Sequence, residues 1–281
     1  MTARSEAYPQ TLFTHLGRYR CDCLGIKEPG IFLHKGRELP KDHILLREDW
    51  QKNFLPLIRD PIRNLMDVNG DPIKWHRFAH HLNSSQVMAV NLFLPLMASE
   101  ERLAMLGKVT GVVTPVAKDT GFELIPDEVE KTNIDVVIGG SGGERLFIEV
   151  KLTEADFGRA ADDGSHREKF ERIYKKRCVG RILLSPGKEW AEFRQNYQFF
   201  RNALFAEEKT RVWFLIPSPH ASLIRRAEAC MKLLDDRIRP KVSLVHLGTI
   251  LDKIEGQVGG NPDLVEHYRQ FRRKYQPALV K

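Results

Sequence analysis

Three charged residues interrupt two apolar stretches near the middle of the chain. Asp135 lies in residues 133–138, and Glu149 and Lys151 lie in residues 145–152. Residues two apart in a β-strand point to one face, so Glu149 and Lys151 share a face. Buried charges are costly unless they are paired or bind a metal. Two carboxylates and an ammonium could hold a divalent cation, or Lys151 could form a structural salt bridge with either carboxylate.

The two stretches are expected to pair as a β-hairpin. Both are rich in β-branched and apolar residues, which is typical of buried strands. Residues 139–143 (GGSGG) lie between them. A Gly-rich segment that cradles phosphate needs a helix directly after it, and here a strand follows, so we predict a hairpin loop. Pairing can bring Asp135 beside Glu149, which favours a functional site over an isolated salt bridge.

The remaining pattern indicates alternating helices and strands around this pair. A helix over 86–106 is expected, capped by Ser84–Ser85 and interrupted near Pro95. Residues 1–74 look irregular, with small strands at 31–33 and 44–46. Further strands are expected at 121–125, 211–216 and 242–247, and further helices at 168–176, 188–208, 221–239 and 262–275. We therefore predict an α/β fold with a central mixed β-sheet flanked by helices.

The charged motif resembles the catalytic signature of the PD-(D/E)XK nuclease superfamily, which has the restriction-endonuclease-like fold. The resemblance rests on NID at 133–135 and IEVK at 148–151 and on the order of the surrounding elements. Ile134 stands where the motif's name has proline, a position that tolerates substitution in the superfamily. The resemblance leaves residues 1–74 unexplained. We therefore expect three segments: an N-terminal accessory region (1–74), a nuclease-like core (75–251) and a C-terminal basic helix packed on the core (252–281).

The resemblance also implies a metal-dependent nuclease that hydrolyses phosphodiester bonds, with DNA favoured over RNA. Asp135, Glu149 and the Val150 carbonyl would hold Mg²⁺, or Mn²⁺ in its place. The ion would polarise the scissile phosphate and activate a water molecule, which Lys151 would position. Two alternatives stay open: a nucleic-acid-binding module on the same fold that does not cleave, and a partner subunit of a larger complex.

Acidic residues flank this motif on both sides. The superfamily often adds a carboxylate from its first helix or first strand, and Glu123 is the candidate here, with Glu128 behind it. Glu154 follows the second charged strand and could support the site. Each of the three could equally be a plain surface carboxylate.

Polar residues on two predicted helices could also contribute. Gln86 and Asn91 interrupt an apolar helix, where they could form structural hydrogen bonds or contact the site. Gln198 and Arg201 are three residues apart and share a helix face. With Asn202, they could form a cluster behind the site or a phosphate clamp.

Other groups of residues could bind a transition metal. His76 and His80 have the i, i+4 spacing of a helical metal pair, with His81 adjacent, but a DNA-backbone contact or a surface position is favoured. A zinc site with unusually tight cysteine spacing could use Cys21, Cys23, His34 and His43.

The distribution of charge points to a polyanionic partner. The chain has 281 residues, 44 of them Lys or Arg and 37 Asp or Glu, for a net charge of +7. Residues 99–158 carry 6 basic and 12 acidic side chains, so the remainder carries +13. Such an acidic island is either a solvated loop or a cation site that faces a phosphate backbone. We expect double-stranded DNA as the partner and keep a homodimer open. The basic runs 175–177, 225–226 and 272–274 suit phosphate contacts or solvated helix faces.

Composition excludes several other classes. No stretch approaches the roughly 18 apolar residues of a membrane-spanning helix, so no membrane partner is expected. The first ten residues, MTARSEAYPQ, lack the apolar region of a secretory signal. Four cysteines do not make a disulfide scaffold. The expected location is cytoplasmic.

Overall fold

The computed structural model describes residues 8–67 and 70–277, and its internal contacts divide the chain into two compact units. One unit comprises residues 112–247, and the other comprises residues 1–111 and 248–281. The boundaries predicted at residues 74 and 251 stay a prediction. Among the described residues, no helix combines the length and hydropathy that crossing a bilayer would require.

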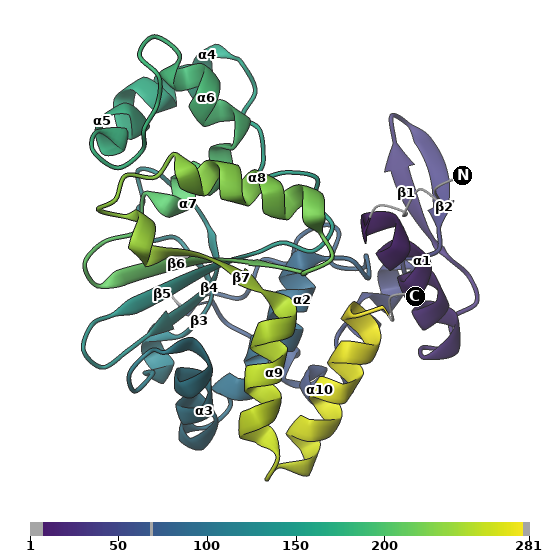
Figure 1. The fold of residues 1–281 in the computed structure, drawn as a ribbon. Helices are drawn as coiled ribbons and strands as arrows, with labels where there is room; N and C mark the ends of the chain where they lie inside the picture. Colours follow the sequence, from purple (N-terminus) through teal and green to yellow (C-terminus); the bar gives the residue numbers. More distant parts are fainter. Residues whose placement is uncertain (1–7, 68–69, 278–281) are drawn as a thin grey trace, which may run out of the picture. The chain divides into compact units, whose positions relative to one another are not determined.

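The unit of residues 112–247 is built on a five-stranded mixed sheet, which confirms the predicted α/β fold (Figure 1). The first three strands are antiparallel neighbours and the last three run parallel to one another. In order across the sheet, they are β3 (Gly121–Leu124), β4 (Ile134–Gly139), β5 (Arg145–Val150), β6 (Thr210–Ile216) and β7 (Val242–His246). The centres of β4, β5 and β6 are buried on both faces, which is why their sequences are nearly continuous apolar runs.

The predicted hairpin between β4 and β5 is confirmed. Val136 pairs with Ile148 and Gly139 pairs with Arg145 in an antiparallel register. The Gly-rich loop closes on itself, with the Gly140 N–H donating to the Glu144 carbonyl at 2.8 Å. The loop therefore turns the chain between two strands, as the sequence indicated.

The helical segment predicted at 168–176 is confirmed within residues 164–178, and the other two predicted helices of this unit are shorter than expected. They are α4 (Gly164–Lys169), a π-helical turn (Phe170–Tyr174), α5 (Lys175–Cys178), α6 (Glu189–Gln195), α7 (Tyr197–Ala203) and α8 (Ala221–Lys232). The helix predicted over 188–208 breaks at Asn196, because the first N–H groups of α7 donate to the carbonyls of Phe157 and Gly158. The helix predicted over 221–239 ends at Lys232, since Leu233 and Asp235 bond to the backbone of residues 181–183 instead.

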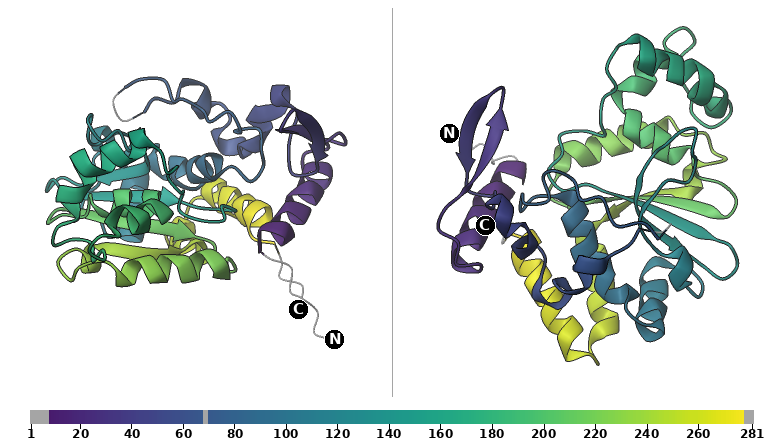
Figure 2. Two further views of the ribbon diagram at one scale, coloured as in Figure 1. Left: turned by 90° about the horizontal axis from the view of Figure 1, so that it is seen from above. Right: turned by 180° about the vertical axis from the view of Figure 1, so that it is seen from behind.

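The other unit is mainly helical and contains a small two-stranded sheet (Figure 2). Its elements are α1 (Tyr8–Asp22), β1 (Gly30–His34), β2 (Arg37–Lys41), three 3₁₀ turns (Arg47–Asn53, Pro56–Ile58 and Pro61–Asn64), α2 (Ser85–Phe93), a fourth 3₁₀ turn (Leu94–Met97), α3 (Glu100–Thr110), α9 (Leu247–Val258) and α10 (Pro262–Tyr275).

Several local predictions can be compared with this unit. The interrupted helix near Pro95 is confirmed as α2 and α3, and the Ser84 side chain caps α2 by accepting from the Val87 N–H at 3.3 Å. The strand at 31–33 is confirmed within β1. The strand at 44–46 is wrong, because Ile44 makes only an isolated bridge to His81. Residues 1–74 were predicted to be irregular, but they contain helix α1. Helix α9 was also not predicted.

A buried polar network joins α2, α10 and the segment before α2. Asn91 Nδ2 donates to Tyr275 Oη at 3.0 Å and to the Asn53 carbonyl at 3.3 Å. His267 Nε2 lies 2.7 Å from the Asn91 carbonyl. Lys274 Nζ donates to Asn53 Oδ1 at 2.5 Å and also to the Asn53 carbonyl. The network gives Asn91 a structural role, and it rules out Lys274 as a phosphate contact because that side chain is fully buried.

This network predicts a pH-dependent stability. Burial, and to a lesser degree the charge of Arg59, lowers the pKa of Lys274 well below its usual 10.5. Between the lowered pKa and 10.5 the unfolded chain binds a proton that the folded chain does not, so the free energy of unfolding rises with pH. The slope reaches at most about 1.4 kcal/mol per pH unit. Denaturant unfolding of wild type at pH 7, 8 and 9 should show this rise, and Lys274→Met should flatten it.

The neighbouring Arg273 is exposed and provides a matched control. Arg273→Met should keep the wild-type pH dependence. Identical slopes for wild type and Lys274→Met would show that Lys274 is not the titrating group.

Candidate active site

Asp135, Glu149 and Lys151 lie together where β4 and β5 meet. Lys151 Nζ is 2.8 Å from Glu149 Oε1, and the two residues are only 6% and 2% exposed. The half-buried Asp135 accepts a hydrogen bond from the Val150 N–H, at 2.7 Å from Oδ2. The hairpin register, continued by one residue beyond Val136 and Ile148, aligns Asp135 with Glu149. The structure therefore brings the three charged groups to one end of the hairpin.

Helix α7 holds the Glu149 carboxylate through two amide side chains. Gln198 Nε2 donates to Glu149 Oε1 and Asn202 Nδ2 donates to Glu149 Oε2, each at 2.6 Å. Gln198 Oε1 accepts from Lys151 Nζ at 2.7 Å. Gln198 and Asn202 are four residues apart and share the helix face that meets the sheet. The sequence had paired Gln198 with Arg201, but Asn202 is the residue that joins it here.

Negative charge is in excess at this cluster. Burial and the nearby charge of Glu149 raise the pKa of Asp135 well above its usual 3.8, and Lys151 and the Val150 N–H offset only part of that rise. Burial alone would lower the pKa of Lys151, but the charges of Glu149, Glu154 and Asp135 outweigh it and raise the pKa. Lys151 is therefore an ammonium at neutral pH, and it faces more than one carboxylate.

Glu123 lies beside this cluster on β3. The register that pairs Phe122 with Val136 and Leu124 with Ile134 places Glu123 next to Asp135, and the charge of Glu123 also contributes to the raised pKa of Asp135. Its backbone has φ of +60°, a left-handed conformation that is costly for a residue with a side chain. Of the three acidic candidates, Glu123 is thus the one adjacent to Asp135.

The other predicted auxiliary residues have local partners. Glu154 Oε2 accepts from the N–H groups of Leu152 and Thr153 at 2.6 and 2.9 Å, so it fixes the turn after β5. Glu128 is exposed. Gln86 belongs to the unit of residues 1–111 and 248–281, where its side chain bonds to the backbone at Lys74 and His76.

Arg201 joins a second buried cluster that the sequence did not reveal. Its Nε donates to Glu130 Oε1 at 2.7 Å, and its guanidinium lies 4.9 Å from the centre of the Tyr197 ring. Glu130 is 1% exposed and also accepts from the Thr132 N–H at 2.6 Å and from the Tyr174 hydroxyl. Burial would raise the pKa of Glu130, but these hydrogen bonds and the charge of Arg201 lower it overall. Glu130 is a single glutamate in a turn, so the sequence gives no sign that it is buried and paired with Arg201.

The proposed transition-metal ligands are not gathered into a site. Within residues 8–67 and 70–277, no three His, Cys, Asp or Glu side chains form a group that could hold a metal. His76 and His80 are not on a helix, because α2 begins only at Ser85. Cys21 is exposed near the end of α1, and Cys23 is half-buried. The carboxylates at the hairpin end are a pair, Asp135 and Glu149, with Glu123 alongside.

A mixed sheet that carries a carboxylate pair and a lysine at the end of a hairpin is consistent with a restriction-endonuclease-like core. The chain matches the family model described as "Restriction Endonuclease associating with ARP" over residues 14–276, and it belongs to this family. No curated protein and no solved structure gives a significant match. The match supports the restriction-endonuclease-like assignment made from residues 133–135 and 148–151.

Proposed function

We propose that the chain is a metal-dependent endonuclease of the PD-(D/E)XK class that hydrolyses phosphodiester bonds in double-stranded DNA. The observation that carries this proposal is the contact of Lys151 with Glu149 at 2.8 Å, with Asp135 beside them. A structural salt bridge needs one carboxylate for each ammonium. Here burial and the nearby charge of Glu149 raise the pKa of Asp135, and a cation beside the two carboxylates would relieve their repulsion.

The residues at this cluster fit a magnesium ion. Mg²⁺ in proteins usually has one or two carboxylate ligands and keeps several waters for substrate phosphates to replace. Asp135, Glu149 and the Val150 carbonyl would hold it, and Mn²⁺ would substitute. When bound, the ion would polarise the scissile phosphate and lower the pKa of a water molecule.

The side chains around the proposed metal site have different roles in this proposal. Lys151 stays protonated, so it orients the attacking water and stabilises charge that develops on the phosphate rather than acting as a general base. Gln198 and Asn202 fix both oxygens of Glu149, so that carboxylate needs little reorganisation. Glu123 is the auxiliary carboxylate. The PD-(D/E)XK resemblance implies products with a 5′-phosphate and a 3′-hydroxyl.

The family description supports a second candidate, a subunit that works with another protein. The family is described as a restriction endonuclease that associates with ARP. Association with such a partner, or with a second copy of this chain, would be compatible with cleavage. The binding-module alternative predicts DNA binding in the absence of any cleavage.

A cleavage assay separates these candidates. Purified protein would be incubated with supercoiled plasmid, linear duplex and single-stranded RNA in Mg²⁺, Mn²⁺ or EDTA, and the ends of any products would be mapped. The proposal expects cut DNA duplex in Mg²⁺ or Mn²⁺ and intact DNA in EDTA. Binding with intact DNA under every condition would favour the non-cleaving module.

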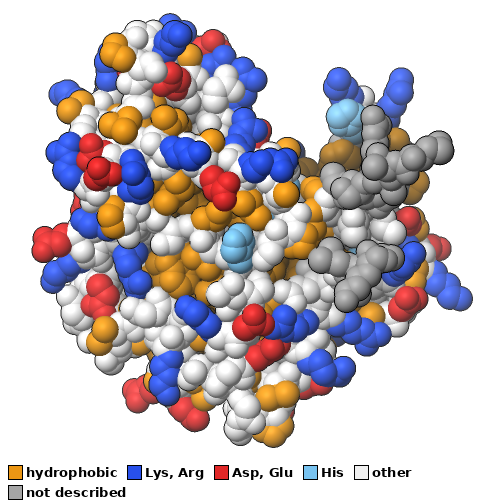
Figure 3. All heavy atoms as spheres, viewed as in Figure 1, with side chains coloured by type: hydrophobic (Ala, Val, Ile, Leu, Met, Phe, Trp, Pro, Cys, Tyr) orange, Lys and Arg blue, Asp and Glu red, His pale blue; other side chains and the backbone are white. Residues whose placement is uncertain are grey.

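Binding to DNA should weaken steeply with salt. Figure 3 shows Lys and Arg side chains spread over the viewed face, and the chain outside residues 99–158 carries +13. Neutralised phosphates release their counterions, so about 4–6 phosphate contacts give a slope of log K against log salt of roughly −4 to −5. Fluorescence anisotropy of a labelled duplex, with Ca²⁺ in place of Mg²⁺, measures this slope. An affinity that does not change with salt would contradict an electrostatic DNA interface.

A further inference from the structure

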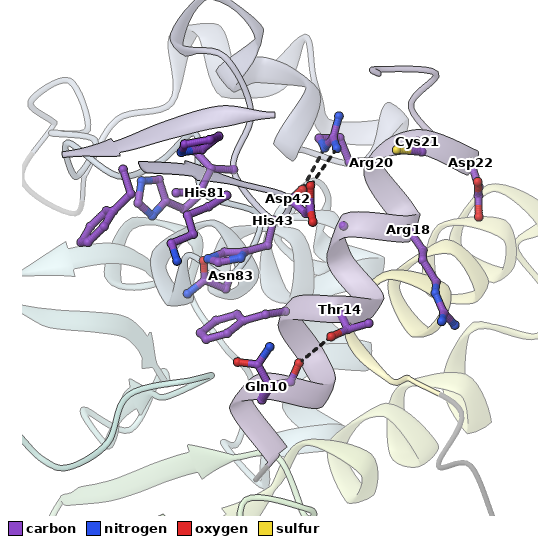
Figure 4. Close-up of a pocket in the computed structure, with 16 residues that line it drawn as sticks. Gln10, Thr14, Arg18, Arg20, Cys21, Asp22, Asp42, His43, His81 and Asn83 are labelled. Atoms are coloured by element: carbon purple, nitrogen blue, oxygen red, sulfur yellow. Dashed lines mark hydrogen bonds and ion pairs between the residues drawn. The ribbon is translucent and has the colours of Figure 1, made fainter. Parts of the chain in front are cut away.

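The unit of residues 1–111 and 248–281 contains a pocket that the proposed nuclease chemistry does not use. It has a volume of about 920 Å³ and is lined by α1, by residues 40–44 at the end of β2 and just after it, and by the segment before α2 (Figure 4). Figure 4 shows His43, His81 and Asn83 together on one side of α1, with Gln10 below them. The volume is within the range of about 300–1,000 Å³ that is typical of small-molecule sites.

Aromatic rings form much of this side of the pocket. His43 stacks on Phe13 with ring centres 4.2 Å apart and planes 16° apart. The His81 ring meets the edge of Phe32 at 6.1 Å and 73°. A planar aromatic ligand could therefore find stacking and edge contacts on two neighbouring walls.

The two histidines bring hydrogen-bonding groups that no neighbour uses. Within the described part of the chain, the ring nitrogens of His43 and His81 make no hydrogen bond, although His81 is only 8% exposed. Burial, with the charges of nearby basic groups, lowers the pKa of His43 to about 4 and that of His81 to about 3. Both rings are thus neutral at physiological pH, and each offers one donor and one acceptor.

These features select one class of ligand. The imidazoles are uncharged, and the lining cations Arg18, Arg20 and Lys41 are largely balanced by Asp22 and Asp42, which disfavours a simple anion as the whole ligand. The described residues contain no group of three ligands for a metal. An apolar ligand would cover the ring nitrogens of both histidines without offering them a hydrogen bond, which disfavours such a ligand. A flat heterocycle with both donors and acceptors on its edge satisfies the stacking rings and the imidazoles together.

We propose that this pocket binds a nucleobase, presented either by an unpaired nucleotide of a DNA strand or by a free nucleotide. The choice of DNA as one source rests on the proposed nuclease function. Binding a single base at a pocket separate from the Asp135, Glu149 and Lys151 cluster would let the chain recognise an unpaired or extruded base before it cuts.

The test measures base binding in EDTA, so that cleavage cannot contribute. One arm titrates the four deoxynucleoside monophosphates by calorimetry. The second arm follows the fluorescence of 2-aminopurine in a duplex, placed either opposite an abasic site or in a matched pair. Saturable binding of monophosphates would identify a free nucleotide as the source, and a signal only from the unpaired 2-aminopurine would identify the strand.

Two substitutions remove the imidazole nitrogens while keeping an aromatic ring. His43→Phe and His81→Phe should each weaken binding about tenfold, as expected for one lost hydrogen bond to a desolvated group. His34→Phe alters an exposed histidine of β1 that does not line the pocket, and it should bind like wild type. Circular dichroism and thermal melting would establish that each variant is folded.

Two results would overturn the proposal: no base binding by wild type in either arm, or wild-type affinity in both folded variants. Neither result depends on the nuclease proposal. A protein that cleaves DNA without base binding would refute only the pocket, and one that binds bases without cleaving would refute only the nuclease.

Discussion

Lys151→Ala is expected to lower Mg²⁺-dependent cleavage of duplex DNA by about 10³-fold, the scale on which a positioned charged group stabilises a transition state. The substitution removes the ammonium that contacts Glu149 and Gln198 and that would face the phosphate. Asp135→Ala should have an effect of the same size, because it removes a ligand for the ion. Initial rates on plasmid and on a defined duplex, in Mg²⁺ and in Mn²⁺, measure both losses.

Lys52 provides a matched control for the loss of a lysine. It is exposed and forms an ion pair with Asp49 at 2.8 Å, whereas the Lys151 pair is buried. Lys52→Ala should therefore keep wild-type rates. Activity that survives in Lys151→Ala, in Asp135→Ala or in EDTA would refute the assigned site. Thermal melting of each variant separates lost chemistry from lost folding.

Asp135→Asn is expected to stabilise the metal-free protein and to reduce its stabilisation by metal. The raised pKa of Asp135 means that the folded chain binds the proton more tightly than the unfolded chain. Stability is therefore lost as pH rises from the usual pKa of 3.8 towards the raised value, and the neutral amide avoids this loss. Each kcal/mol gained should raise Tm by about 2–4 °C.

Metal addition provides the second half of this test. An ion that binds only the folded chain stabilises wild type by about 2.7 kcal/mol at 100 times Kd. Asp135→Asn should shift much less on addition of Mg²⁺ or Mn²⁺, because one charged ligand is gone. A structural salt bridge predicts the opposite pattern, in which the variant is less stable and metal changes neither protein. Differential scanning fluorimetry at pH 7.5, with and without metal, distinguishes the two.

Asp235 serves as the control for removal of a carboxylate charge. Its pKa is lowered, chiefly by the hydrogen bond from Arg237, so its charge is compensated. Asp235→Asn should therefore not raise Tm, and it should keep the full response to metal. A similar rise in Tm for both asparagine variants would indicate a general effect of net charge rather than relief of charge repulsion at Asp135.

The sequence by itself determined the hairpin and the shared face of its charges. Strand geometry is strictly periodic, so the positions of Glu149 and Lys151, two apart in an apolar run, fixed their common side without knowledge of any neighbour. The Gly-rich loop followed directly by a strand likewise determined that β4 and β5 pair. The cap at Ser84 and the break at Pro95 are also local effects, and both were predictable.

Helices that depend on packing were harder to foresee. Helix α9 contains Gly248 and Gly256, which weaken a helix, and its buried Ile250, Leu251 and Ile254 stabilise it only through contacts. The break at Asn196, where α7 begins, depends on carbonyls of residues 157–158, which are distant in sequence. Local propensity carries no information about such partners.

Only the tertiary structure decided which polar side chains complete the site. On a helix, i+3 and i+4 neighbours are both adjacent, and the direction in which the helix docks selects between them. Docking of α7 turns Gln198 and Asn202 towards Glu149 and leaves Arg201 to neutralise the buried Glu130. Packing of α10 likewise decided the position of Lys274. Its place in a basic run had suggested an exposed phosphate contact, but its side chain is buried. Charge and spacing are properties of the chain, but burial and partner are properties of the fold.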